Sequence, residues 1–237
     1  MSATGNAVGR TASTRAPDKS AWPARLDLLQ SLSGLLLAAF LAVHLLLDSA
    51  ILIGPGAADF VARFFEGEHL FGSPQPWIVS AAALGLLALL VVHAALAMRK
   101  FPHAHRDYMQ LREHVRTFGH ADTRLWWWQA LTGFALFFLV SAHLIIMITQ
   151  PEAIGAEPST FRIVQQGAWV FYLALLPIVL VHAAVGVYRL SVKWGVPPLA
   201  NAMAAERRRV AMWIVTAMYL ALGLASLATY VYRGLAG

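Results

Sequence analysis

Two stretches of the chain, QSLSGLLLAAFLAVH at residues 30–44 and QALTGFALFFLVSAH at residues 129–143, follow one pattern. In each, a Gln opens an apolar run, a Gly follows four residues later, and a His closes the run fourteen residues after the Gln. Ionisable side chains are costly inside long apolar segments and usually have a functional reason to be there. The repetition therefore indicates that both segments perform the same structural task.

The whole chain is too apolar for a water-soluble domain. Of its 237 residues, 59% are hydrophobic and 13% are charged, and the mean hydropathy is +0.61. Five apolar runs are long enough to cross a hydrocarbon core of about 30 Å as α-helices, at residues 28–53, 77–98, 125–149, 168–188 and 210–232. We therefore expect an all-α integral membrane bundle of five transmembrane helices over residues 25–237. A disordered or interfacial N-terminal tail over residues 1–24 precedes it.

Basic residues gather in alternate connections between the apolar runs. The N-terminal tail, the second connection and the fourth connection together hold 15 of the 18 Lys and Arg residues. By the positive-inside rule, this asymmetry predicts a cytoplasmic N-terminus and a C-terminus outside. Because the positive charge flanks membrane spans, it gives no indication of nucleic-acid binding.

The chain contains no cysteine. It therefore cannot form disulfides, ligate an iron–sulfur cluster through thiolates, or attach a c-type haem covalently. Any iron–sulfur chemistry linked to this chain must belong to another polypeptide.

Four of the nine histidines lie inside four different predicted spans. Given the expected topology, His44 and His143 fall in the outer half of the membrane, whereas His93 and His182 fall in the inner half. The inner two share a second pattern, VHAALA at residues 92–97 and VHAAVG at residues 181–186. The sequence therefore predicts two histidine pairs at two depths.

A pair of neutral imidazoles can ligate haem iron, zinc or copper. Zinc favours further Cys, Asp or Glu ligands, and the sequence offers none near the inner pair. Haem b needs only two axial imidazoles, because the porphyrin supplies four nitrogens. We therefore predict two b haems, with the inner iron held by His93 and His182 and the outer iron by His44 and His143.

Small residues accompany the repeated pattern at equivalent positions, namely Ser33 with Gly34 and Thr132 with Gly133. Small side chains allow a flat macrocycle or a neighbouring helix to approach a helix backbone closely. We expect one of these two uses, and ordinary helix packing accounts for the glycines equally well.

Six stretches, LDLLQSLSG, FFEGEHLFG, HAALAMRKFP, DTRLWWWQALTGF, HLIIMITQP and VGVYRLSVKWG, carry a resemblance to a known family. They resemble the di-haem cytochrome b membrane anchor of fumarate reductase and succinate dehydrogenase, in its single-polypeptide form. The resemblance covers nearly all of residues 23–232, and all four intramembrane histidines match its haem ligands.

The resemblance implies a subunit of a succinate:quinone or quinol:fumarate oxidoreductase in the cell inner membrane. Its partners would be a flavoprotein subunit and an iron–sulfur subunit on the cytoplasmic face, and two complexes can associate side by side in this family. The chain would pass electrons through two b haems between menaquinone, or another quinone, and the iron–sulfur subunit. It would not act on fumarate or succinate alone, and the physiological direction stays open.

The resemblance also implies roles for residues outside the histidines. Inner haem propionates would be bound by residues at the cytoplasmic helix ends, namely Gln30, Ser31, Trp126 and Lys193, of which the lysine offers charge-assisted hydrogen bonds. Glu66 would belong to the quinone site, since quinone chemistry moves protons with electrons. Trp126 fits an interfacial aromatic belt equally well, and Glu66 fits a solvated loop acid.

Two positions depart from the family pattern. Several relatives carry a Glu, implicated in proton movement, two residues before the fourth haem histidine, where this chain has Leu180. Asp48 follows His44 by one helical turn, and an acid inside a span needs a partner. Asp48 could serve a proton path or the outer haem, or it could simply reach water at the interface.

Two alternative functions remain at this stage. One is the di-haem cytochrome b subunit of a hydrogenase or formate dehydrogenase, whose surrounding motifs differ from those quoted above. The other is a transporter that uses intramembrane histidines, for which broken helices at the midplane would be expected. Pro177, five residues before His182, is the one proline that interrupts a predicted span.

Overall fold

The computed structural model describes residues 20–101, 106, 109, 113, 121–195 and 202–236. This part of the chain is helical and contains no β-strand. Its five long helices are apolar enough to cross a membrane: α1 (Trp22–Asp48, continued by the 3-10 turn η1, Ser49–Leu52), α4 (Pro76–Met98), α6 (Ala121–Thr149), α8 (Trp169–Lys193) and α9 (Ala202–Ala236). The prediction of an all-α bundle with five membrane-spanning helices is confirmed.

Most of the predicted N-terminal tail lies outside the described residues, and α1 already begins at Trp22. The helix α8 continues across Pro177, so this proline does not break the span. Which end of the bundle faces the cytoplasm stays a prediction.

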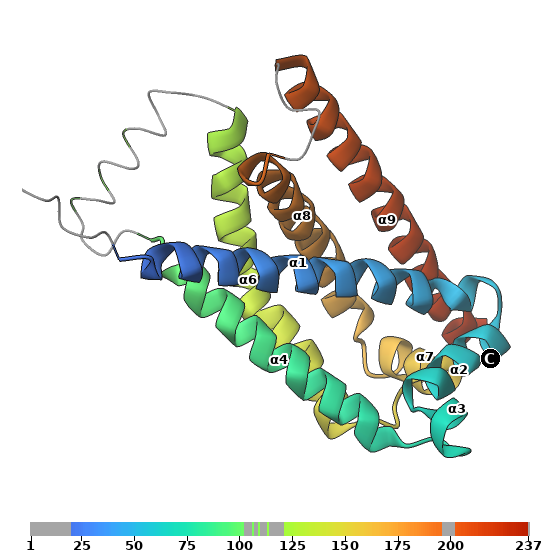
Figure 1. Cartoon of the computed structure of the whole chain (residues 1–237). Coiled ribbons are helices and arrows are strands. Elements are labelled where there is room, and N and C mark those ends of the chain that lie inside the picture. The colour runs from blue at the N-terminus through green and yellow to red at the C-terminus, as the bar shows by residue number, and fades with distance from the viewer. Residues whose placement is uncertain are drawn as a thin grey trace, which may run out of the picture.

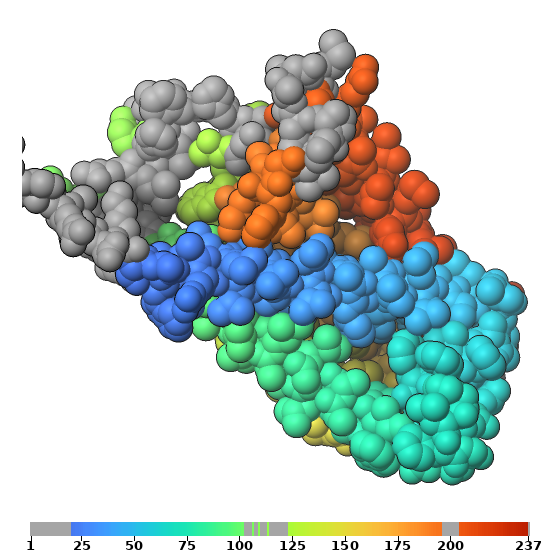
Figure 2. Space-filling view, viewed as in Figure 1, coloured from blue at the N-terminus to red at the C-terminus, as the bar shows by residue number. Residues whose placement is uncertain are grey.

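Four of the long helices form a closed ring. The helix α1 packs against α4, α4 against α6, α6 against α8, and α8 against α1, while α9 lies along α8 (Figure 1). The two repeated segments thus lie on α1 and α6, and each is followed in the chain by a helix that packs against it, α4 or α8. On the face shown in Figure 2, α1 forms a continuous strip above α4.

Three short helices gather at the end of the bundle that also holds the C-terminus (Figure 1). They are α2 (Pro55–Phe65), α3 (Glu68–Phe71) and α7 (Ala156–Val164). They lie in connections for which the apolar runs predict no structure. Pro55 favours the start of α2, and the Asp59 carboxylate of α2 accepts a hydrogen bond of 2.7 Å from the first backbone N–H of α7, at Ala156.

Charged residues join three helices at the opposite end. The Asp27 carboxylate of α1 lies 2.7 Å from the Arg99 guanidinium and 3.3 Å from the Lys100 ammonium, both at the end of α4. The Lys193 ammonium of α8 donates to the Asp27 backbone carbonyl at 3.2 Å. Because these groups are partly exposed, they contribute more to helix register than to stability.

Large apolar side chains are exposed on all five long helices. Examples with about half or more of their surface exposed are Leu36, Leu84, Phe134, Leu173 and Met218. Such continuous apolar exposure is typical of a surface solvated by lipid rather than by water.

Replacing Gly234 with Ala should loosen the contact between α7 and α9. A Cβ at this position would lie 2.5 Å from Val164 Cγ2 and 2.9 Å from Val164 Cβ, too close for two carbon atoms. We expect a loss of about 1–3 kcal/mol through overpacking, measured as a lower unfolding temperature of the purified protein in detergent. The matched control is Gly85→Ala in α4, where a Cβ would have no neighbour within 4 Å. Equal stability of the two variants would contradict the close packing of α7 on α9.

Candidate functional site

All four intramembrane histidines line one cavity inside the helix ring. Its volume is about 1450 Å³, and it extends from the end of α8 at Lys193 to Ser159 and Arg162 of α7. Pockets for one small molecule usually measure about 300–1000 Å³. The cavity is therefore large enough for more than one group of that size.

The structure brings His44 of α1 and His143 of α6 together. Their ring centroids are 6.3 Å apart, with an angle of 48° between the ring planes. A bond between a metal and an imidazole nitrogen is about 2 Å long, so two rings on opposite sides of one metal have centroids about 6 Å apart. Phe40 stacks on His44, and the Tyr172 hydroxyl lies 3.5 Å from His143 Nδ1.

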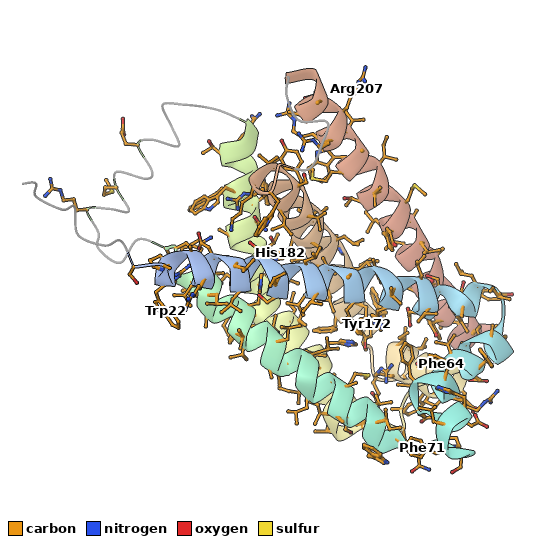
Figure 3. The ribbon with its side chains drawn as sticks, viewed as in Figure 1. Trp22, Phe64, Phe71, Tyr172, His182 and Arg207 are labelled. Carbon is orange, nitrogen blue, oxygen red and sulfur yellow. The ribbon has the colours of Figure 1, made fainter. Side chains whose placement is uncertain are left out.

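His93 of α4 and His182 of α8 form a second group in the same cavity. The Ser33 hydroxyl of α1 lies 3.1 Å from His93 Nδ1, and the Thr132 hydroxyl of α6 lies 3.2 Å from His182 Nδ1. In the side-chain view, His182 lies behind α1, and Tyr172 lies nearer to the end formed by α2, α3 and α7 (Figure 3). The two pairs thus lie at different depths along the bundle.

Hydrogen bonding fixes the tautomer of both inner histidines. The Ser33 hydroxyl donates to the Gln30 carbonyl at 3.1 Å, and the Thr132 hydroxyl donates to the Trp128 carbonyl at 2.7 Å. Each hydroxyl has only one hydrogen, so it must accept the bond from the imidazole. Nδ1 therefore carries the proton, and Nε2 keeps the lone pair that a metal needs.

The repeated glycines make room for these imidazole rings. A Cβ on Gly34 would lie 2.9 Å from His93 Cε1, and a Cβ on Gly133 would lie 2.9 Å from His182 Cε1. Of the two uses expected for these small residues, the structure shows the second: each glycine admits a side chain of the neighbouring helix. The sequence signal was the equal spacing of hydroxyl and glycine in both repeats, but it did not indicate which histidine they contact.

Residues predicted to bind the inner propionates line the same cavity, and they are Gln30, Ser31, Trp126 and Lys193. Lys193 donates to the Ser31 hydroxyl at 2.9 Å. Among the described residues, the buried side-chain oxygen of Gln30 has no hydrogen-bond partner. If the amide turns, its NH₂ group can instead donate to an anionic carboxylate. This end of the cavity therefore fits the propionates of a haem.

Arg162 was missed by sequence reasoning. It is only 9% exposed, lines the α7 end of the cavity and donates hydrogen bonds to the Ala153 carbonyl and the Ser159 hydroxyl. Its buried Nε has no partner within the described part of the chain. A buried guanidinium favours an anionic partner, and Asp48 lines the same end. The sequence placed Arg162 in an outer connection and gave no sign that α7 buries it.

Glu66 lies at the C-terminal end of α2 and is 9% exposed. Burial raises the pKa of its carboxyl, the neighbouring Glu68 adds to the rise, and Arg63 offsets part of it. Ala62 and Phe65 of the same helix line the cavity, whereas Glu66 is not among the described residues of its wall. The carboxyl therefore lies beside the outer end of the cavity rather than in it.

Within the described residues, no group of three or more His, Cys, Asp or Glu side chains could hold a metal ion. Protein-only sites such as structural zinc centres need about four ligands. Histidine pairs in a large apolar cavity fit a macrocyclic metal cofactor better, because the cofactor brings most of its own ligands.

Comparison with known proteins decides the family. The family described as "Succinate dehydrogenase/Fumarate reductase transmembrane subunit" matches residues 105–224. A protein of Helicobacter pylori named fumarate reductase cytochrome b subunit is 43% identical over 217 residues, which cover 92% of this chain and 84% of that protein. This chain belongs to the succinate dehydrogenase/fumarate reductase transmembrane subunit family. The fumarate reductase cytochrome b subunit of Wolinella succinogenes is 42% identical over 222 residues, covering 92% of this chain and 85% of its own length.

Membership of this transmembrane subunit family confirms the resemblance identified from the sequence. It weighs against the two alternatives, a hydrogenase or formate dehydrogenase cytochrome and a transporter. Leu180, the departure two residues before His182, is buried in α8.

Adding a methyl group at either repeated glycine should displace an inner imidazole. In Gly34→Ala and Gly133→Ala, the new Cβ would lie 2.9 Å from the ring of His93 or His182, so the ring must move. We expect the haem retained per purified chain to fall in both variants, measured by pyridine haemochrome absorbance. Gly85→Ala serves as the control, since its Cβ would meet no atom within 4 Å. Normal haem content in both variants would show that the ring position is not needed for binding.

Proposed function

We propose that this chain is the membrane anchor and quinone-reactive subunit of a fumarate reductase or succinate dehydrogenase complex. It would hold two b haems between a quinone, such as menaquinone, and an iron–sulfur subunit. The observation that carries this proposal is one cavity lined by two histidine pairs. At each end it has a buried polar atom, on Gln30 and Arg162, that has no partner among the residues the structure describes.

Each histidine pair would hold one haem iron. His93 and His182 would ligate the inner haem, with propionates near Gln30, Ser31, Trp126 and Lys193, and His44 and His143 would ligate the outer haem, with Arg162 beside its propionates. A b haem with two axial imidazoles takes up and releases one electron at a time.

The protein's own contribution is to orient the ligands and to exclude water. Ser33 and Thr132 keep the inner imidazoles in the Nδ1–H tautomer. Apolar side chains, including Leu86, Leu136 and Leu144, line the cavity between its polar ends. Such a hydrophobic wall limits solvent access, which tunes the potential of a bound redox group.

Any iron–sulfur cluster that exchanges electrons with these haems would belong to another polypeptide, because this sequence has no cysteine to hold one. The end formed by Asp27, Arg99, Lys100 and Lys193 carries the charged contacts between α1, α4 and α8. We place the flavoprotein and iron–sulfur subunits at this end, on the cytoplasmic side of the inner membrane. The charge asymmetry of the connections supports this placement.

Glu66 would exchange protons with the quinone at the outer end. A carboxyl whose pKa is raised by burial can both accept and release a proton closer to neutral pH than an exposed one. Its position beside the cavity wall at Ala62 and Phe65 supports this role.

The first test is a reduced-minus-oxidised visible spectrum of the purified complex, with haem quantified per chain. We expect two low-spin b haems that titrate in separate steps. Replacing His93 or His143 with Ala should remove the haem of that pair. The control His69→Ala should retain both haems, because His69 is exposed and stacks on Phe64. A folded wild-type complex without haem would overturn the proposal.

The second test concerns Glu66. Glu66→Gln should lower quinol oxidation by about 100-fold or more while both haems are retained, because a positioned acid–base group contributes roughly that factor. In the unmodified protein the carboxylate must be ionised to accept a proton. Activity should therefore fall as the pH drops through its raised pKa, which lies above the ordinary 4.5.

The matched control for Glu66→Gln is Glu68→Gln. Glu68 pairs with Arg63 at 3.1 Å on a more exposed surface. We expect this variant to keep both its activity and the acid limb of the pH profile. Full activity in Glu66→Gln would exclude the proton-transfer role.

A further inference from the structure

The hydroxyl residues of the repeated pattern, Ser33 and Thr132, are both buried at equivalent places beside the inner histidines. Each belongs to one helix of a sequential pair and contacts the histidine of the other: Ser33 of α1 with His93 of α4, and Thr132 of α6 with His182 of α8. Each hydroxyl also donates its only hydrogen to a backbone carbonyl of its own helix. Both can therefore act only as acceptors toward Nδ1–H.

We propose that Ser33 and Thr132 are positioning residues that lower the redox potential of the inner haem. This inference rests on the proposed function, since it assumes that His93 and His182 ligate the inner iron. An acceptor on Nδ1–H makes the imidazole a stronger donor through Nε2. Stronger donation stabilises the oxidised iron relative to the reduced iron.

The outer pair has a different environment. His143 Nδ1 lies 3.5 Å from the Tyr172 hydroxyl, a distance at the limit of a hydrogen bond. The Arg162 cation also acts on Tyr172 and makes its oxygen a weaker acceptor. A hydroxyl thus lies closer to Nδ1 of each inner histidine than to Nδ1 of His143, and this difference should separate the potentials of the two haems.

Backbone carbonyls provide a second acceptor at each inner ring. The Gln129 carbonyl lies 3.1 Å from His182 Nδ1, and the Gln30 carbonyl is close enough to act on His93. Removing one hydroxyl thus leaves the ring partly held. Variants should keep the haem while its potential changes, which makes the inference testable in an assembled complex.

The experiment is a spectroelectrochemical titration of the purified complex with Ser33→Ala, Thr132→Val and both together. We expect the ratio of reduced to oxidised inner haem, at a fixed potential, to rise by about threefold in each single variant. The double variant should shift it by about tenfold, which corresponds to 59 mV for one electron. The outer haem should not shift. The electron paramagnetic resonance signal of the inner haem should also change, because the imidazole ring of His93 or His182 is then less restrained in its orientation.

Matched controls come from α9. Thr216 and Ser226 are buried and donate to the carbonyls of Met212 and Leu222, as Thr132 and Ser33 do within their own helices, but neither lines the cavity. Thr216→Val and Ser226→Ala should leave both haem potentials unchanged. The exchanged variants Ser33→Thr and Thr132→Ser should restore the normal inner potential, because each keeps a hydroxyl.

Several outcomes would overturn the inference. Two haems per chain with an unchanged inner potential in the double variant would exclude the proposed tuning, as would equal shifts of both haems. If Ser33→Ala loses the inner haem but Ser33→Thr retains it, the hydroxyl is needed to hold the haem rather than to tune its potential, and the inference fails. If both lose it, side-chain packing decides instead and the inference fails. A wild-type complex without two haems would overturn the proposed function together with this inference.

Discussion

A histidine inside a membrane needs a hydrogen-bond partner for one ring nitrogen before it can offer the other to a ligand. In this protein the partners are Ser33 and Thr132, each supplied by the helix that precedes the histidine-bearing helix in the ring. Both hydroxyls are buried, so water has little access to replace them. The Ser33–His93 contact therefore constrains how α1 packs on α4, and the Thr132–His182 contact constrains how α6 packs on α8. These four helices also form the wall of the cavity.

The two ends of the cavity differ in whether their charged side chains are exposed or buried. One end joins α1 to the end of α4 through Asp27, Arg99 and Lys100, all partly exposed, and to α8 through Lys193. The other end buries Arg162 under the short helix α7. A group with anionic arms at both ends and an apolar middle matches this arrangement. Two haems placed one above the other would satisfy it, each with its propionates directed toward one end.

Much of the fold was predictable because lipid imposes simple rules on sequence. Length and hydropathy were sufficient for the five spans, and loop charge with residue spacing sufficed to pair His44 with His143 at one depth. The short helices were not predictable, because α7 depends on a tertiary contact from Asp59 of α2. The burial of Arg162 follows from that contact. The contacts of the repeated glycines also depend on how the helices pack. The sequence therefore revealed Gly34 and Gly133, but it could not indicate that they face the rings of His93 and His182.

The repeat has a consequence for biogenesis. Each hairpin, α1 with α4 and α6 with α8, contains one inner histidine together with the hydroxyl and glycine that orient it. A hairpin inserted by the translocon thus carries a preformed half-site before its counterpart has been synthesised. The packing of α4 on α6 and of α8 on α1 then brings the two half-sites together.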